Sequence, residues 1–294
     1  MNPFIYRTPE TLEEALTLLR EHGEGAKVIA GGTALIIMLK QRLVMPEVLI
    51  SLHRLKGLDA VQAVNGAVRL GGLLTHRNAE LAPLLQQHLP VLAQTYRHVA
   101  TVRIRNMATV AGSLAHADPN QDPPVTLLAL DAQAQLTSAH GTRDIPLTEF
   151  FTDYYETVLG PEELLTAIHI PLPQPHTGST YVKFLPRSAD DYATVGVAAT
   201  VRVDPATGAC ADCRIAMGCV GVTPIRAQQA EQLVRGQQQT AELLREVGAV
   251  AQEATDPLSD TRGSAAYKRS MAGVFVRRAL EQAWQQALAS VTPG

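Results

Sequence analysis

The 294-residue chain is poor in cysteine and aromatic residues and has no long apolar run. Its three cysteines are too few for a disulfide framework. The longest uninterrupted apolar run, residues 34–39, is far shorter than the roughly 20 residues of a membrane helix. The N-terminus lacks the basic segment and apolar stretch of a secretory signal. A net charge of −3 gives no reason to expect nucleic acid or an anionic membrane as partner. We therefore expect a cytoplasmic protein without a membrane span.

Metal sites and nucleophilic catalysis are not indicated either. Cys210, Cys213 and Cys219 offer three thiols, but a fourth ligand is missing. Residues three apart on a strand face opposite ways, and Cys213 and Cys219 alternate with Ile215 and Met217, so we expect buried cysteines on an apolar face. The chain has no P-loop, no G-x-G-x-x-G and no G-x-S-x-G, which leaves a Rossmann-type nucleotide site unsupported. We assign no metal ligand and no catalytic residue.

Two glycine-containing turns carry most of the information. Residues 30–34 read Ala-Gly-Gly-Thr-Ala, and residues 109–113 read Thr-Val-Ala-Gly-Ser. Each offers consecutive backbone N–H groups with little side-chain bulk, so each can wrap around a phosphate oxygen. Thr33 and Ser113 add hydroxyl donors, and a helix beginning after Thr33 would point its positive end at the anion. Taken alone, each is more typical of a plain tight turn, but the pair predicts a ligand with two phosphates, a dinucleotide.

The first fifty residues predict an α/β unit. Leucines at helical spacing indicate a helix over 11–22, with a capping box from Thr11 and Glu14 and an end at Gly23. A short buried strand is expected over 27–30 and another strand over 48–52. The Asn65-Gly66 pair predicts a hairpin over 61–72, and helices over 78–87 and 90–100 follow.

The rest of the chain predicts a second, antiparallel domain. Prolines at 119, 123 and 124 are expected to prevent a helix directly after the second turn, with a helical segment over 125–130. Strands are expected over 133–146 and 164–171, and the proline-rich stretch 171–178 marks a domain boundary. Alternating patterns predict strands over 194–203 and 213–219, followed by helices over 225–235, 240–252 and 264–287. The fold class is therefore α+β, with domains at 1–173 (subdomains about 1–52 and 53–173) and 178–288.

Four further side chains are candidates for ligand contact. Asp118 and Asp122 would repel a phosphate, so they are better suited to accept hydrogen bonds from a ribose or from the N–H groups of a flavin ring. Asp-Pro turn chemistry is the open alternative. Tyr181 and Lys183 share one face of a predicted strand and could stack on and polarise a flat heterocycle; an ordinary surface strand would look the same.

Together these segments resemble the FAD-binding medium subunit of the molybdenum hydroxylases, the family of aerobic carbon monoxide dehydrogenase and the xanthine dehydrogenases. The resemblance covers nearly the whole chain. The segments that carry it are residues 6–9, 30–43, 105–113, 160–165, 260–263 and 267–273. Two positions depart from the family pattern: Ala111 stands where a second glycine is usual, and Cys219 where a small residue is common. The Ala111 methyl is expected to crowd one phosphate contact mildly.

The resemblance implies a two-part FAD-binding domain of the vanillyl-alcohol oxidase (PCMH) type, followed by a smaller C-terminal domain of antiparallel sheet and helices. It implies that FAD is held non-covalently, with the pyrophosphate on the two turns and the isoalloxazine near residues 164–165, 181 and 183. The positions to which FAD contacts are carried over are Ile29, Ala30, Gly31, Gly32, Thr33, Ala34, Leu35, Thr109, Ala111, Gly112, Ser113, His116, Asp118, Asp122, Leu165, Tyr181 and Lys183.

The function implied by the resemblance is that of an electron-transfer flavoprotein subunit. Electrons from [2Fe–2S] clusters on a small partner chain would reach FAD here and leave to an external acceptor, while a large partner chain carries the molybdopterin cofactor. The implied assembly is a dimer of heterotrimers. The chain has no cysteine-rich insertion that would indicate a cluster of its own. An autonomous FAD-dependent oxidoreductase, with His116 or Tyr192 as base, stays open, as does a flavin-free assembly partner.

Overall fold

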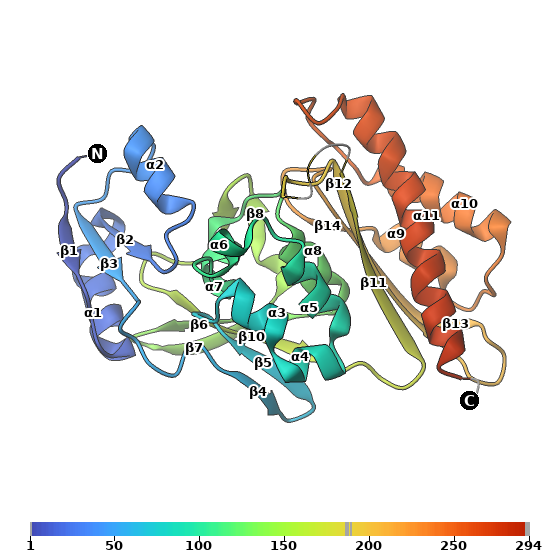
Figure 1. Ribbon diagram of the computed structural model, residues 1–294, viewed down its shortest axis with the longest axis horizontal. Coiled ribbons are helices and arrows are strands. Elements are labelled where there is room, and N and C mark those ends of the chain that lie inside the picture. The colour runs from blue at the N-terminus through green and yellow to red at the C-terminus, as the bar shows by residue number, and fades with distance from the viewer. Residues whose placement is uncertain (1, 186–187, 189, 292–294) are drawn as a thin grey trace.

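The computed structural model describes residues 2–185, 188 and 190–291, and the chain runs along its long axis from a small N-terminal subdomain to a C-terminal domain (Figure 1). The α+β fold class is confirmed, since helices pack on sheets that are largely antiparallel. In the part of the chain that the structure describes, no helix has both the length and the apolar character needed to cross a bilayer.

The first subdomain is a three-stranded parallel sheet with two helices. Its elements are β1 (Ile5–Arg7), α1 (Leu12–His22), a 3₁₀ turn (Gly23–Gly25), β2 (Ala26–Ile29), α2 (Leu35–Gln41) and β3 (Val48–Ser51), in the sheet order β1-β3-β2. Thr11 caps α1 by accepting the Glu14 N–H, whereas the Glu14 carboxylate accepts the N–H of Glu10, one residue before the expected capping box. Strand β3 is central and buried. The prediction of a buried strand at 27–30 is wrong in one respect, because β2 is an edge strand and only half-buried.

The second subdomain contains a five-stranded antiparallel sheet. It comprises β4 (Val61–Val64), β5 (Ala67–Gly71), β6 (Gln133–Ser138), β7 (Gly141–Pro146) and β10 (Leu164–Pro171), in the order β4-β5-β10-β6-β7. The predicted hairpin is confirmed: Asn65 and Gly66 have φ of 49° and 77°, as a two-residue turn of type I′ requires. Between β7 and β10 lie a 3₁₀ turn (Leu147–Glu149) and the small hairpin of β8 (Phe151–Asp153) and β9 (Glu156–Thr157).

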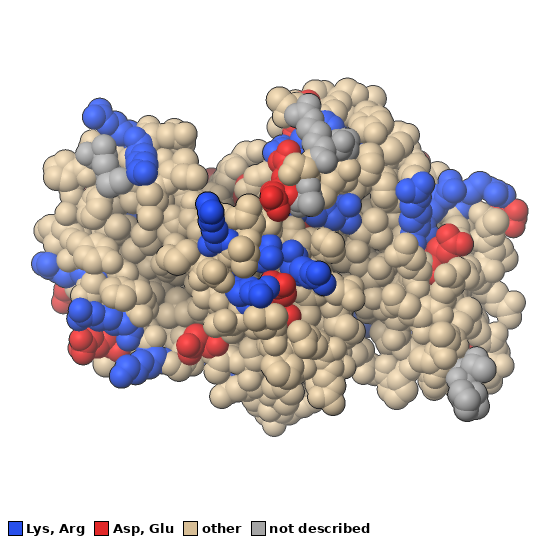
Figure 2. Space-filling view, in the orientation of Figure 1, with Lys and Arg blue, Asp and Glu red and all other residues tan. Residues whose placement is uncertain are grey.

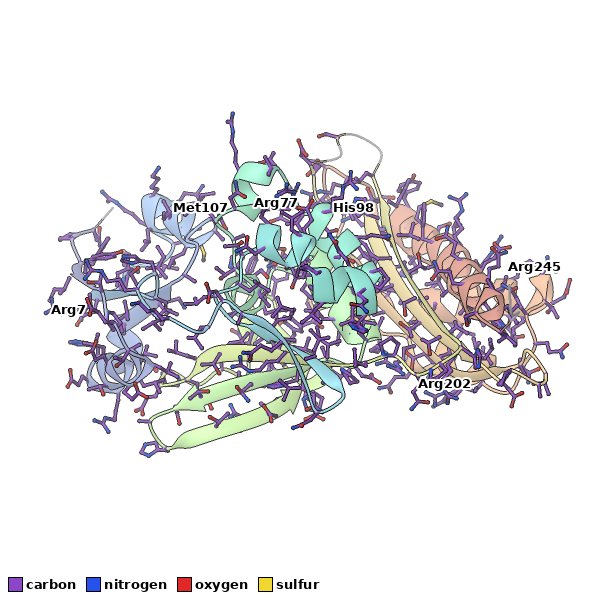
Figure 3. The ribbon with its side chains drawn as sticks, turned by 60° about the horizontal axis from the view of Figure 1, so that its bottom comes forward. Arg7, Arg77, His98, Met107, Arg202 and Arg245 are labelled. Atoms are coloured by element: carbon purple, nitrogen blue, oxygen red, sulfur yellow. The ribbon has the colours of Figure 1, made fainter. Side chains whose placement is uncertain are left out.

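Six helices connect β5 to β6 and cover one face of this sheet (Figure 3). They are α3 (His76–Leu81), α4 (Pro83–His88), α5 (Pro90–Arg97), α6 (Val102–Arg105), α7 (Val110–His116) and α8 (Asp122–Ala129). The predicted helix over 78–87 is two helices, because Pro83 cannot continue α3 and instead begins α4. The predicted exclusion of a helix near the second turn is also wrong: α7 begins inside that turn, and Pro123 and Pro124 lie in the first turn of α8, where no N–H is needed.

The C-terminal domain is an antiparallel sheet with helices, as predicted. Strands β11 (Thr177–Phe184), β12 (Val195–Val203), β13 (Cys210–Gly218) and β14 (Ile225–Arg226) pair in sequence order. Helices α9 (Gln228–Val234), α10 (Ala241–Glu253) and α11 (Ala265–Ala289) cover one face, where the odd-numbered residues of β12 enter the core. The opposite face packs against α8, so Ala198 and Ala216 belong to the core of the second subdomain.

The three cysteines are free and buried, and Cys213 shares the apolar face of Ile215 and Met217 as predicted, but Cys210 and Cys219 do not lie as expected. Cys210 and Cys213 share one apolar core, because the register of β12 and β13 shifts between Arg202 and Val203 and turns Cys210 inward. Cys219 does not continue this face. It follows β13 with φ of 66°, and its thiol faces the carbonyl of Asn120 in the second subdomain.

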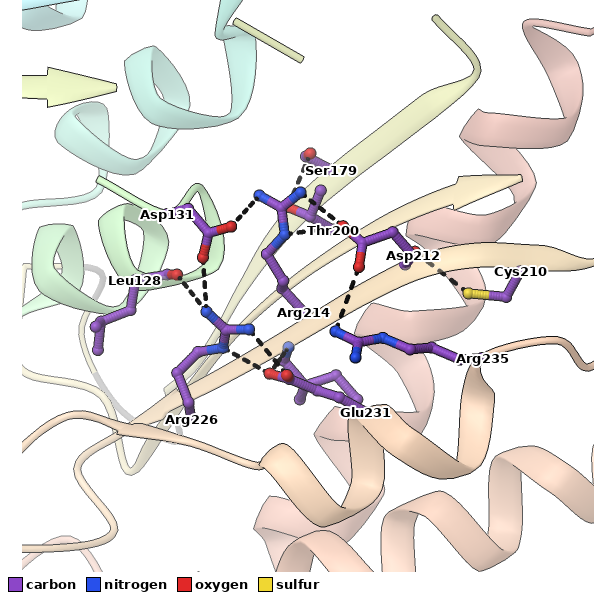
Figure 4. Close-up of polar contacts among 11 residues, drawn as sticks. Leu128, Asp131, Ser179, Thr200, Cys210, Asp212, Arg214, Arg226, Glu231 and Arg235 are labelled. Atoms are coloured by element: carbon purple, nitrogen blue, oxygen red, sulfur yellow. Dashed lines mark hydrogen bonds and ion pairs between the residues drawn. The ribbon is translucent and has the colours of Figure 1, made fainter. Parts of the chain in front are cut away.

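Ion pairs connect the C-terminal domain to the end of α8. Asp131, just beyond α8, lies 2.9 Å from the guanidinium groups of both Arg214 and Arg226 (Figure 4). Arg226 also donates to the Leu128 carbonyl and pairs at 2.6 Å with the buried Glu231. The two domains therefore share both a core and a charged network. The first subdomain is more separate, and the molecular outline has a notch beside it on the side of α2 (Figure 2).

Candidate functional site

The first glycine turn joins β2 to α2 and presents a row of unpaired backbone donors. Within the described residues, the N–H groups of positions 31 to 35 have no protein acceptor, whereas the next one, on Ile36, donates to the Gly32 carbonyl. The turn is half-buried, and Gly32 has φ of 69°, which favours glycine. Ala34 precedes α2 without capping it by a side chain. A row of free donors at the start of a helix is the arrangement that binds an anion.

The two turns touch, as the prediction of a shared ligand requires. A Cβ on Gly31 would overlap the carbonyl of Met107, just before the second turn. A Cβ on Gly112 would lie 3.7 Å from the Cβ of Ala30. The backbones therefore approach closely because Gly31 has no side chain, whereas a methyl on Gly112 would meet the first turn only at an ordinary contact distance. A ligand can reach both turns without meeting a Cβ at either one.

The prediction that the second turn binds phosphate through its N–H groups is wrong, because these groups already have acceptors within the protein. The N–H groups of Val110 and Ala111 donate to the Leu74 and Gly72 carbonyls, both at 2.9 Å. Thr109 caps α7 by accepting the Gly112 N–H, and the Ser113 hydroxyl donates to the Val110 carbonyl at 3.1 Å. These donors are therefore already satisfied within the protein.

The predicted crowding by Ala111 is also wrong. Its side chain is buried against Gly72, where an added Cβ would lie 3.0 Å from the Ala111 methyl. The methyl thus points into the protein, while Gly112 lies on the exposed side of α7. Leu165 lies on the same inner side, with its carbonyl against Gly72.

His76 is a buried neighbour of the second turn that the sequence did not single out. It is the first residue of α3, is 1% exposed, and its Nε2 lies 3.3 Å from the Ser113 hydroxyl. Burial lowers its pKa to about 4, so the imidazole is neutral at pH 7. Its ring packs 5.0 Å from that of Tyr96. Among the described residues, His76 Nδ1 and the Tyr96 hydroxyl have no partner.

Asp122, Tyr181 and Lys183 meet across the domain boundary. The two oxygens of the Asp122 carboxylate accept from the Tyr181 hydroxyl at 2.5 Å and from Lys183 Nζ at 2.8 Å. Lys183 also donates to the His98 carbonyl at 2.9 Å. Burial raises the pKa of Asp122, and the Lys183 charge opposes that rise. The prediction that Tyr181 and Lys183 share a face is confirmed, but this face lies against α8 and is closed.

Asp118 and His116 belong to an aromatic cluster at the other end of α7. The Asp118 carboxylate accepts both the backbone and side-chain N–H groups of Asn120, at 2.9 and 3.0 Å, which is the Asx-turn alternative. The His116 ring lies 5.1 Å from that of Tyr155. Burial and the nearby Asp118 charge raise the pKa of Tyr155 to about 12. The sequence analysis did not single out the adjacent pair Tyr154 and Tyr155, which could have indicated this aromatic cluster.

The predicted residues therefore fall into three neighbouring groups. The first, around the two turns, fits a diphosphate because it combines free N–H groups at the start of a helix with the exposed backbone of Gly112 beside them. The second, at the far end of α7, offers half-exposed aromatic rings and the exposed Tyr192 beneath the Arg262 guanidinium, 5.2 Å away. The third is the closed contact of Asp122. Together they match a ligand with a diphosphate at one end and a flat ring system at the other.

Comparisons with known proteins agree with this geometry. Residues 2–173 match the FAD binding domain in molybdopterin dehydrogenase, and residues 180–283 match the CO dehydrogenase flavoprotein C-terminal domain. The chain is 34% identical to the carbon monoxide dehydrogenase medium chain of Hydrogenophaga pseudoflava, covering 96% of this chain and 97% of that one. It is 33% identical to subunit alpha of the 6-hydroxypseudooxynicotine dehydrogenase complex of Paenarthrobacter nicotinovorans, with coverage of 97% and 95%.

A solved structure supports the same similarity at the level of the fold. Carbon monoxide dehydrogenase from Hydrogenophaga pseudoflava, in a form that lacks the Mo-pyranopterin moiety, contains a chain that superposes with a TM-score of 0.93. The two chains are 35% identical over 97% of this chain and 99% of that one.

Proposed function

This chain belongs to the FAD-binding medium subunits of the molybdenum hydroxylases, and from this membership we propose that it is the flavoprotein electron relay of a three-subunit complex. The observation that carries the proposal is the row of free N–H groups at 31 to 35, on a turn that packs against Met107 and lies beside Gly112. When bound, FAD supplies the capacity to take electrons from a partner chain's [2Fe–2S] clusters and pass them to an external acceptor.

The residues of this chain have binding and positioning tasks. The first turn holds the pyrophosphate with its N–H groups and the Thr33 hydroxyl, and the second turn closes the cradle with Thr109 and Gly112. His116 and Asp118 lie at the end of α7, between the cradle and the ring system, and Leu165 supports this region from the buried side of Gly72. Asp122, Tyr181 and Lys183 hold the domains together at its far side. No group here needs to act on the organic substrate.

We also propose the finer organisation of the complex. The FAD-binding domain spans 1–173 and the C-terminal domain 178–288. A large chain carries the molybdopterin cofactor and a small chain carries the clusters, in a cytoplasmic dimer of heterotrimers. The domain bounds are supported by the end of β10 at Pro171 and the start of β11 at Thr177, and the partners by the multi-subunit relatives.

The test begins with the purified chain and added FAD. We expect a yellow protein with a flavin absorption band, and no reduction of the flavin by candidate organic substrates. Co-expression with the two partner chains should yield a complex with iron and molybdenum, in which substrate reduces the flavin. A chain that stays colourless with excess FAD would contradict the flavoprotein assignment. Turnover by the isolated chain would instead establish the autonomous oxidoreductase.

A further inference from the structure

Arg262 of the C-terminal domain lies over a partly exposed aromatic ring near the far end of α7. Its guanidinium carbon is 5.2 Å from the centre of the Tyr192 ring, and the Tyr192 side chain is 42% exposed. A guanidinium over the face of an aromatic ring is attracted by the negative charge of that face. Arg262 therefore covers one face of a ring that stays partly open to a ligand.

Tyr192 belongs to the same aromatic group as Tyr155, although the two residues come from different domains. Tyr155 lies in the β8–β9 hairpin of the second subdomain, and Tyr192 lies between β11 and β12. Asp118 is a neighbour of both, and burial together with the Asp118 charge raises the pKa of each tyrosine. Both hydroxyls therefore stay protonated at pH 7 and can donate to the carboxylate. The C-terminal domain thus contributes one ring to the group at the end of α7.

Two carboxylates hold the Arg262 guanidinium. Asp260 lies 3.3 Å from it and also accepts the Arg262 backbone N–H at 2.8 Å, and Asp191 lies 3.5 Å away. Asp260 is in turn fixed by Lys268 of α11, whose Nζ lies 2.8 Å from the carboxylate and also donates to the Leu258 carbonyl at 3.0 Å. The Lys268 side chain is only 4% exposed. Arg262 is therefore connected to the buried first turn of α11.

This placement leaves one donor of Arg262 without a partner. Its Nε is buried and has no acceptor among the described residues. A buried N–H group without a partner is costly, and such a group in a folded protein calls for an explanation. The hydrogen bonds alone therefore do not account for the position of the guanidinium, which the contact with the Tyr192 ring explains.

We propose that Arg262 is a positioning residue for the flat end of FAD: it fixes the Tyr192 ring in the orientation that contacts the ring system. The proposal rests on the electron-relay function proposed above. A ring that is already fixed loses less conformational freedom when the ligand binds, so Arg262 strengthens binding without touching the ligand. Binding of the ring system then depends on the C-terminal domain, whereas binding of the diphosphate depends on the two turns.

A purely structural role is the alternative. The contacts of Arg262 could serve only to join residues 190–194 to the loop before α11. Loss of Arg262 would then lower stability, or weaken both ends of the ligand site equally. The two roles can be separated by the ligand, because ADP has the diphosphate but lacks the flavin ring system.

The experiment titrates the purified full-length chain with FAD and, separately, with ADP by isothermal titration calorimetry. We expect Arg262→Met to bind FAD roughly 3- to 30-fold more weakly, the range that a cation–π contact accounts for. Its ADP affinity and its Tm should stay unchanged. Arg262→Lys keeps a cation over the ring and should recover most of the FAD affinity.

Arg278→Met is the matched control for the loss of this contact. The Arg278 guanidinium lies 5.0 Å over the Phe275 ring of its own helix, α11, and Phe275 belongs to the core of the C-terminal domain. This variant therefore loses a contact of the same kind outside the ring group. Its affinities for FAD and for ADP should both equal those of the unaltered chain.

A double variant tests whether Arg262 acts through Tyr192. Tyr192→Leu alone should weaken FAD binding at least as much as Arg262→Met, and combining the two should cause no further loss. Losses that multiply would overturn the positioning role. Equal losses for FAD and ADP, an unchanged FAD affinity in Arg262→Met, or no recovery in Arg262→Lys would overturn it as well.

Arg262→Gln keeps the test valid if Arg262→Met fails to fold. Its amide keeps an N–H donor for Asp260 but carries no charge, so the same selective loss of FAD affinity is expected. Failure of the unaltered chain to bind either FAD or ADP would instead contradict the proposed function.

Discussion

At Gly31 the backbone of the first turn lies directly against the Met107 carbonyl, and this contact brings the two turns together. Adding a single methyl group at this position therefore tests whether the close contact of the two turns is needed for FAD binding. Gly31→Ala would force the segment at 107–108 away, at a cost of about 1–3 kcal/mol, and the cradle would open. We expect FAD to bind roughly 10- to 100-fold more weakly, measured by flavin fluorescence titration.

Gly221→Ala is the matched control for this substitution. Gly221 has an ordinary backbone conformation, and a Cβ there would meet the Thr223 carbonyl at 3.4 Å and the Ile225 side chain at 3.9 Å. Its FAD affinity should equal that of the unaltered chain. Equal affinities in both variants would show that the closeness of the two turns does not matter for binding.

His76 makes stability depend on pH in a defined window. Its folded pKa of about 4 lies below the usual 6.5, so the unfolded chain binds a proton that the folded chain excludes. Stability from this group is complete above pH 6.5 and is lost as the pH falls towards 4, by about 3 kcal/mol. In His76→Asn this loss is absent, so the free energies of unfolding of variant and parent should converge between pH 7 and 4.

The exposed His140, at a hairpin tip, provides the comparison for this prediction. His140→Asn should leave the pH profile of urea unfolding unchanged. A constant difference between His76→Asn and the parent across the window would show that the imidazole is not buried in its neutral form.

At this scale the sequence identified the right turns but not their chemistry. Gly31 and Gly112 were predicted from their lack of bulk, and their backbones do meet. The donors of the second turn are satisfied by the Leu74 and Gly72 carbonyls, which are distant in sequence. His76 carries no local signal, because only the tertiary fold brings it to Ser113.

Among the elements, α8 and β11 are connected by a charge pair that has almost no access to water. The side chains of Lys183 and Asp122 are 4% and 5% exposed. Lys183→Met would leave a buried carboxylate with Tyr181 as its remaining partner, and we expect a loss of about 3–5 kcal/mol in unfolding free energy. Adding Asp122→Asn should restore part of that loss, as urea unfolding of the double-mutant cycle would show.

Lys56→Met, at an exposed lysine just after the first subdomain, should change stability by less than about 0.5 kcal/mol. If the losses of Lys183→Met and Asp122→Asn simply add in the double variant, the two side chains do not act as a pair. The same cycle followed by FAD titration would show whether the pair also affects the ring site.

Elements were predictable where their signals are local. The Asn65-Gly66 hairpin and the amphipathic alternation of β12 depend on neighbouring residues, and both are as predicted. The start of α7 was missed because Thr109 is a helix cap and the glycine after it is helical. The orientation of Cys210 was missed because a register shift against β12 determines it, and such a shift leaves no mark in one strand.

At the scale of the whole molecule, FAD binding should increase the free energy of unfolding. A ligand that binds only the folded chain adds about 2.7 kcal/mol when its free concentration is one hundred times Kd. We therefore expect Tm to rise steadily with added FAD in differential scanning calorimetry. Riboflavin has the ring system without phosphates, so it should produce a much smaller rise at equal concentration. An equal rise with riboflavin would contradict a diphosphate cradle.

The fold class and family followed from sequence, whereas the sheet orders did not. Motifs in a fixed order over the whole chain indicated the family. The pairing of β10 with β5 joins segments nearly a hundred residues apart, and β10 also pairs with β6 across the intervening strands β7, β8 and β9; periodicity carries no information about such partners. The burial of Asp122 beneath Tyr181 and Lys183 of β11 could not be predicted for the same reason, because it depends on how the two domains pack together.

The core shared by the second subdomain and the C-terminal sheet limits how such chains can be recombined. Ala198 and Ala216 face α8 as part of the core of the second subdomain, and they are almost completely buried. A chimera that joins this FAD-binding domain to the C-terminal domain of a relative must therefore keep small residues at both positions. A chimera that folds would need to take α8, β12 and β13 from the same parent, because these three elements pack against one another. The linker between the domains is therefore not a suitable place to join two parents.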